Sequence, residues 1–367
     1  MLKGLNIQEL AAKIAANQGT KRDLIASTDR VQVVARDGGV KLQVFGQDYG
    51  VDAETVIQKV AHDQIAAHTG IPRDYYERML TGRTETDRKG RERLVIPPRP
   101  ELLAQNVNTW FNANPQKRLV RQMGGATRAF LSNRYQRIEN EEIAEVALPV
   151  LLNLPNVQIV SAEVTERRLY IQFVVPTIQG EVKVGDVVQA GGVITNSEVG
   201  LGSVSVSGLI WRLWCLNGAK TQDVFRRNHV GRAVEDNDAL WADDTKAADD
   251  KTVLLKVRDM VKGIVDQTRF QAQLEKLRGL TEGKVTGDPG KAVEVLAQKV
   301  GATEGEKSSI LRKLIEGGDL SRWGLLNAVT GIAHEAKSYD RAVEIEGMGG
   351  ALIELPADQW REVLQAA

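Results

Sequence analysis

The chain contains few of the residues that build covalent or metal centres. Among 367 residues there is one cysteine, Cys215, and there are four histidines. A single cysteine excludes an internal disulfide and a cysteine-based zinc site, and it suits a reducing compartment such as the bacterial cytoplasm. The histidines His62, His68, His229 and His334 include no i,i+4 pair that would present two ligands on one helix face. We therefore expect no metal and no cofactor.

Net charge, aromatic residues and long apolar runs are also lacking. The 48 basic and 48 acidic residues cancel, so any affinity for a polyanion must come from a local patch. Aromatic residues make up 5% of the chain, so the core must be mainly aliphatic. No run approaches the roughly 18 apolar residues of a membrane span, and residues 1–15 mix apolar with polar positions. We expect neither a signal peptide nor a membrane partner.

No pattern in the sequence indicates a catalytic centre. Cys215 lies in the apolar run Leu209–Leu216, which favours a buried thiol, whereas a reactive thiolate needs a partly exposed, electropositive setting. Residues 200–203, Gly-Leu-Gly-Ser, lack the Gly-Lys-Ser/Thr ending of a phosphate loop. They lead into alternating Val and Ser, with serines at 203, 205 and 207, which predicts a strand with one wet face. We therefore predict a protein that is not an enzyme.

Hydrophobic patterning predicts an α+β fold in three parts, at 1–100, 101–232 and 233–367. In the first part we expect a helix, a hairpin that turns at Asp37-Gly38-Gly39, two further helices and an exposed linker at 81–100. Most of the strand signal lies in the central part, which predicts a largely antiparallel sheet interrupted by a helix at 139–152 with Asn140 as its cap. An acidic, solvated connection at 235–250 then precedes a helical C-terminal region that starts at Val253.

One basic segment points to a binding function. Residues 116–138 contain six basic and no acidic side chains, with Phe130 and Tyr135 interleaved. Arginine and aromatic side chains on a strand suit a surface that contacts phosphates and stacks bases, and period-two alternation would expose Arg128, Phe130 and Ser132. The alternative is a sheet with ordinary solvent-facing arginines. The candidate nucleic-acid-binding residues are Arg118, Arg121, Arg128, Arg134, Tyr135, Arg137, Arg167, Arg168, Arg226, Arg227, His229 and Arg232.

Four ordered blocks carry a family resemblance, at residues 128–135, 167–170, 194–200 with the following 211–218, and 229–232. Together they resemble the phage- and plasmid-like family called domain of unknown function 932. The resemblance implies a product of a mobile element that works near DNA recombination, and it supplies no catalytic residue. We expect a non-enzymatic protein that binds single-stranded DNA, in recombination or strand annealing, and that could form a homo-oligomer. The alternatives are a protein-interaction or assembly factor of the element, and an enzyme with an unfamiliar site.

Overall fold

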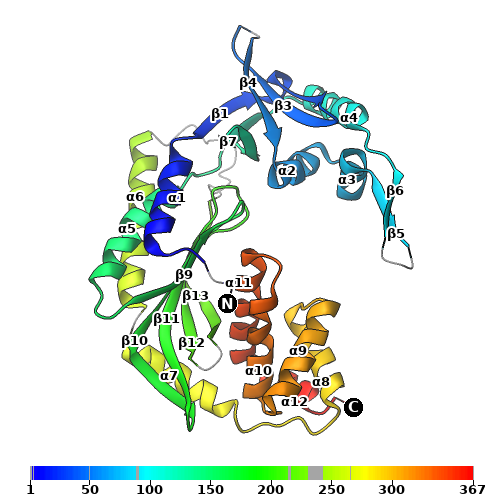
Figure 1. Cartoon of the computed structure of the whole chain (residues 1–367). Coiled ribbons are helices and arrows are strands. Elements are labelled where there is room, and N and C mark those ends of the chain that lie inside the picture. Colours follow the sequence, from blue (N-terminus) through cyan, green and yellow to red (C-terminus); the bar gives the residue numbers. More distant parts are fainter. Residues whose placement is uncertain are drawn as a thin grey trace.

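The computed structural model describes residues 2, 4–48, 50–87, 91–213, 216–229, 243–264 and 266–366. Their strands form a six-stranded sheet, a five-stranded sheet and a two-stranded ribbon, and the C-terminal third is helical (Figure 1). The predicted α+β class, with largely antiparallel strands and a helical C-terminal region, is confirmed. The predictions for Cys215 and Arg232 lie outside the described residues. Among those residues, none of the helices offers an apolar stretch that could cross a lipid bilayer.

The six-stranded sheet combines strands from both sides of residue 100. Its order is β1-β7-β8-β4-β3-β2, and only the β4–β8 pair is parallel. The predicted turn is present, with Asp37 and Gly38 at positive φ. Because β1 and β4 pair with β7 and β8, the division expected at residue 100 does not separate two sheets. The strands are β1 (Lys21–Ser27), β2 (Val31–Arg36), β3 (Gly39–Phe45), β4 (Val51–Ile57), β7 (Lys117–Met123) and β8 (Ala126–Ser132).

Three helices pack on this sheet or beside it. They are α2 (Lys59–Thr69), α3 (Arg73–Thr81) and α4 (Pro100–Ala113). Leu42 of the sheet, Ile65 of α2, and Leu103 and Phe111 of α4 are fully buried in the shared core. The stretch expected to be a linker instead forms an antiparallel ribbon of β5 (Arg83–Thr86) and β6 (Glu92–Ile96), which projects from the molecule (Figure 1).

The five-stranded sheet is an antiparallel meander in the order β13-β12-β11-β10-β9. Alternate residues of β10, such as Leu169 and Ile171, face a core formed with Leu10 of α1, Ile143 of α5 and Val257 of α6. The N-cap of α5 is Glu139 rather than Asn140, and its backbone N–H donates to Glu142 at 2.7 Å. The elements are α1 (Ile7–Gln18), α5 (Asn140–Asn153), α6 (Asp243–Gly263), β9 (Gln158–Val164), β10 (Leu169–Lys183), β11 (Asp186–Asn196), β12 (Val204–Arg212) and β13 (Asn217–Arg227).

The opposite face of this sheet carries α11, within the C-terminal helices. Tyr339 of α11 contacts Tyr170 of β10, and a Cβ on Gly350 would lie 1.7 Å from the Lys220 carbonyl oxygen. Glycine at 350 therefore allows the helix to approach β13 closely. The described part of the acidic segment, residues 243–250, belongs to α6 and is not a connection. The remaining helices are α7 (Gln267–Gly279), α8 (Pro289–Val300), α9 (Glu304–Gly317), α10 (Arg322–Gly331), α11 (Tyr339–Ile353) and α12 (Ala357–Leu364).

Candidate functional site

Two of the arginines predicted to be exposed are buried between the two larger sheets. Arg121 of β7 is 1% exposed and Arg128 of β8 is 5% exposed. Arg121 donates to Asp23 at 3.0 Å and to the Glu198 carbonyl at 2.9 Å, and it also pairs with Glu139. Arg128 donates to the Glu198 carboxylate at 2.5 Å. The prediction of a wet surface at these two positions is wrong, because the segment after β11 brings Glu198 over this face of β7 and β8.

The buried charges form one network of ion pairs. Lys21 of β1 lies 2.7 Å from Glu198 and 2.9 Å from Glu139. Burial opposes ionisation of Glu198, but the hydrogen bond with Glu139 and the charges of Arg128 and Lys21 outweigh it and lower the pKa of Glu198. The network therefore joins the two sheets and leaves Arg121 and Arg128 no access to a nucleic acid.

Tyr135 and His229 are also buried. The Tyr135 hydroxyl donates to the Ser197 carbonyl at 2.7 Å, and its ring stacks on His229 with centroids 5.2 Å apart. Tyr135 is 9% exposed and His229 2% exposed, so neither ring can stack on a base at the surface. Both are structural, contrary to the prediction.

The other predicted residues are scattered rather than joined in one basic strip. Arg118 is half-buried and contacts His68, and Arg137 is exposed beside Asp23. Arg227 pairs with Asp249 at 2.6 Å. Arg134 and Arg167 are exposed in the turns that follow β8 and β9.

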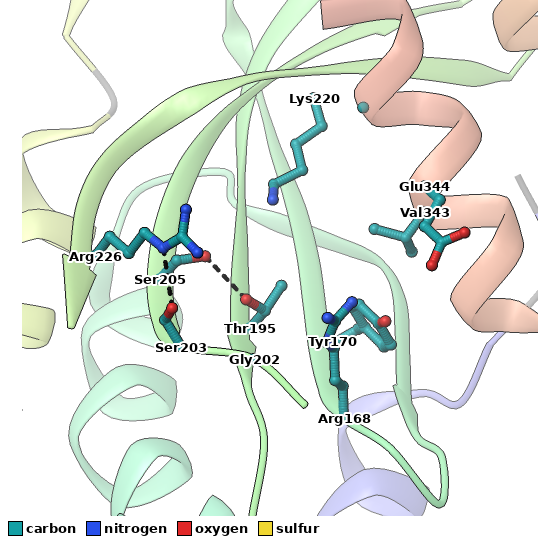
Figure 2. Close-up of a pocket in the computed structure, with 11 residues that line it drawn as sticks. Arg168, Tyr170, Thr195, Gly202, Ser203, Ser205, Lys220, Arg226, Val343 and Glu344 are labelled. Carbon is teal, nitrogen blue, oxygen red and sulfur yellow. Dashed lines mark hydrogen bonds between the residues drawn. The ribbon is translucent and has the colours of Figure 1, made fainter. Parts of the chain in front are cut away.

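Arg168 and Arg226 come together at a pocket between the five-stranded sheet and α11. The pocket has a volume of about 230 Å³. Lys220 of β13 reaches toward its centre, with Arg226 and two serines on one side and Val343 and Glu344 of α11 on the other (Figure 2). The lining residues are Arg168, Tyr170, Thr195, Gly202, Ser203, Ser205, Lys220, Arg226, Val343, Glu344 and Gly347.

Hydroxyl groups form the floor of the pocket. Thr195 and Ser205 lie on neighbouring strands, 8% and 4% exposed, with their oxygens 2.9 Å apart. Each hydroxyl has one hydrogen, and the bond between them uses one of the two, so the other can be donated to a ligand. Ser205 and Ser207 are buried, so the prediction that they face water is wrong. They lie on the face of the sheet that α11 covers.

The segment between β11 and β12 positions the arginines of the pocket. Arg168 Nε donates to the Leu201 carbonyl at 3.1 Å, and a Cβ on Gly202 would lie 2.8 Å from that nitrogen. Glycine at 202 therefore leaves room for the guanidinium group. Arg226 Nε donates to Ser203 Oγ at 2.9 Å, and Ser203 in turn donates to Asn228 at 2.8 Å. Both guanidinium groups are thus oriented by hydrogen bonds at one edge of the pocket.

The charge of the pocket is positive. Arg168, Lys220 and Arg226 line it, against the single carboxylate of Glu344. Glu344 is itself paired with Arg341, 2.9 Å away on the same helix. Cations together with hydroxyl donors are the groups that bind phosphate oxygens. The described residues contain no cluster of three or more His, Cys, Asp or Glu side chains that could hold a metal ion.

Most residues of this pocket could not be predicted from the sequence. Arg168 and Arg226 were predicted, but Lys220, the hydroxyl pair and the residues of α11 were missed. Period-two alternation in β11 and β12 places Thr195 and Ser205 on one face, yet which helix covers that face depends on long-range packing.

None of the family models, curated proteins or solved structures compared with the chain matches it. The resemblance to domain of unknown function 932 therefore stays a prediction. The fold and the pocket define an α+β protein with a positively charged, hydroxyl-lined pocket between an antiparallel sheet and a helix.

Proposed function

We propose that this chain is a non-enzymatic protein that binds single-stranded nucleic acid through the pocket, in the DNA recombination or strand annealing of a phage or plasmid. The observation that carries the proposal is the convergence of Arg168, Lys220 and Arg226 on one pocket with buried hydroxyl groups. The place of this activity in a mobile element rests on the family resemblance alone.

The chemistry of the pocket favours an anion that offers several oxygens, such as a phosphate group, over an apolar ligand. Arginine donors form bidentate, charge-assisted bonds with phosphate oxygens, and hydroxyl groups add neutral donors. A neutral chain has no overall field that attracts a polyanion, so a local pocket of this kind is required. A flexible single strand can bring one phosphate into a pocket of about 230 Å³, which is too narrow for a duplex.

A protein-interaction role is the second candidate, and exposed apolar side chains favour it. Leu94 and Val95 of β6 are 50% and 48% exposed, and Trp110 of α4 is 55% exposed. Exposed apolar side chains on a projecting ribbon suit contact with another protein. This role does not account for the buried hydroxyl pair or the cations of the pocket.

The test is the affinity of a labelled single-stranded oligonucleotide for the parent protein and for Arg226→Ala, measured over a series of salt concentrations. Loss of a charged hydrogen bond should weaken binding by about 1.5–3 kcal/mol. The slope of log affinity against log salt should fall by about 0.7 for each phosphate contact removed. Arg226 is exposed, so the variant should keep its melting temperature.

Arg258→Ala is the matched control. Arg258 is an arginine of α6 with a half-buried side chain, 40% exposed, and its partner is the neighbouring Asp259. Helix α6 packs on the opposite face of the same sheet. The Arg258→Ala variant should bind like the parent. Equal losses in the two variants, or no binding by the parent at low salt, would favour the protein-interaction role.

A further inference from the structure

The pocket is closed at the end farthest from solvent. Its floor is formed by Tyr170, Ser205 and Thr195, which are 1%, 4% and 8% exposed, and the side opposite Arg226 is closed by α11 (Figure 2). The Tyr170 hydroxyl donates to Asp340 at 2.8 Å, so this residue ties the floor to the helix. A nucleic-acid strand that entered the pocket with an internal segment would have to turn back, whereas the end of a strand could be bound there.

The size of the pocket agrees with a terminal group. Pockets that enclose a whole drug-sized ligand measure about 300–1,000 Å³. The volume of about 230 Å³ is smaller and fits the end of a chain rather than several nucleotides.

The charge of the pocket distinguishes two kinds of phosphate. An internal phosphodiester carries one negative charge, whereas a phosphate monoester carries about −1.5 to −2 at neutral pH and has three terminal oxygens. Three cations line the pocket, and its one carboxylate is paired with Arg341. The Arg226 guanidinium group, the Lys220 ammonium group and the spare hydroxyl hydrogen supply enough donors for a group with three terminal oxygens.

Building on the proposed function, we infer that the pocket binds the terminal phosphate monoester of a single strand, with Arg226, Lys220 and the Thr195–Ser205 hydroxyl pair around its oxygens. The rest of the strand then leaves past Arg168 toward solvent. The protein therefore distinguishes phosphorylated strand ends from strand ends that carry a hydroxyl.

The experiment compares one labelled single-stranded oligonucleotide with a 5′-phosphate, with a 3′-phosphate and with hydroxyl groups at both ends. We expect one of the phosphorylated forms to bind at least about tenfold more tightly than the unmodified form, because the monoester gains charge-assisted hydrogen bonds. In Ser205→Ala and in Arg226→Ala this ratio should fall toward one. Arg226 is exposed, so Arg226→Ala should stay folded. It therefore tests the ratio of the two affinities even if Ser205→Ala, which changes a buried side chain, is destabilised.

The experiment separates failure of this inference from failure of the proposed function. Equal binding of all three forms would overturn the inference and leave single-strand binding intact, whereas binding of none would overturn the proposed function. A nucleoside monophosphate or inorganic phosphate serves as competitor to separate a strand end from a free anion. If a nucleoside monophosphate or inorganic phosphate competes at the same concentration as the unlabelled phosphorylated oligonucleotide, the assignment to a strand end is overturned.

Discussion

Single residues decide which arginines hold the fold together and which can bind. Arg128 and Glu198 are both buried, and their charges are 2.5 Å apart. Arg167 is also an arginine beside a strand, but it is exposed. Regular period-two alternation would place Arg128 on the face opposite Ala129. The register of β7 and β8 shifts between Arg121 and Gln122, so Arg128 has no partner in the ladder and reaches Glu198, as Arg121 does.

Arg128→Ala should therefore unfold the protein more easily, without a specific effect on binding. Removing one partner leaves the Glu198 carboxylate buried with fewer partners, which costs about 3–5 kcal/mol. Arg167→Ala, the matched change at the surface, should alter the free energy of unfolding by about 0.5 kcal/mol or less. Urea denaturation of both variants measures the difference. A stable Arg128→Ala protein that had lost oligonucleotide binding would contradict the structural role.

At the scale of elements, the contact between α11 and β10 contains a buried carboxyl group. Glu346 is 0% exposed, and its Oε2 accepts from Gln172 at 2.7 Å while Oε1 is buried without a partner. Burial raises the pKa of Glu346 from 4.5 to about 7. The native protein therefore keeps this proton over a pH range in which the unfolded chain has released it.

The free energy of unfolding should consequently contain a term that falls as the pH rises from about 4.5 to about 7 and is constant above that range. Its slope is at most about 1.4 kcal/mol per pH unit. The Glu346→Gln variant has no carboxyl group at this position. The free energy of unfolding of the variant minus that of the parent should therefore increase as the pH rises from about 4.5 to about 7. Urea denaturation at pH 5, 6, 7 and 8 measures this difference. Parallel curves for the two proteins would show that the carboxyl group is not held protonated.

The sequence predicted elements wherever the pattern was local. The hairpin at Asp37-Gly38, the strands from Lys117 to Ser132 and the helix at 139–152 could be predicted because turn residues and periodicity mark them. The helix α11 could not, because apolar residues and close-packed glycines cover most of its surface and leave a weak amphipathic pattern. The ribbon of β5 and β6 was also missed, since its strands are short, charged and exposed.

At the scale of the whole molecule, the pocket depends on three parts of the chain that are distant in sequence. The turn between β9 and β10 supplies Arg168, β13 supplies Lys220 and Arg226, and α11 closes the side opposite Arg226. The segment after β11 extends from the buried charge network at Glu198 to the pocket at Ser203. The pocket therefore depends on the packing of the C-terminal helices against the central sheet, which no single motif encodes.

The most direct measurement fills the pocket without removing a charge. Gly347 of α11 lines the pocket, and a Cβ built on it meets nothing within 4 Å. Gly305 of α9 has equally open space at the surface, so Gly305→Leu is the matched control. We predict that Gly347→Leu loses affinity for a single-stranded oligonucleotide at least about tenfold, or about 1.4 kcal/mol, while its melting temperature and the affinity of Gly305→Leu stay near those of the parent. Parent-like affinity in a folded Gly347→Leu protein would contradict binding at the pocket.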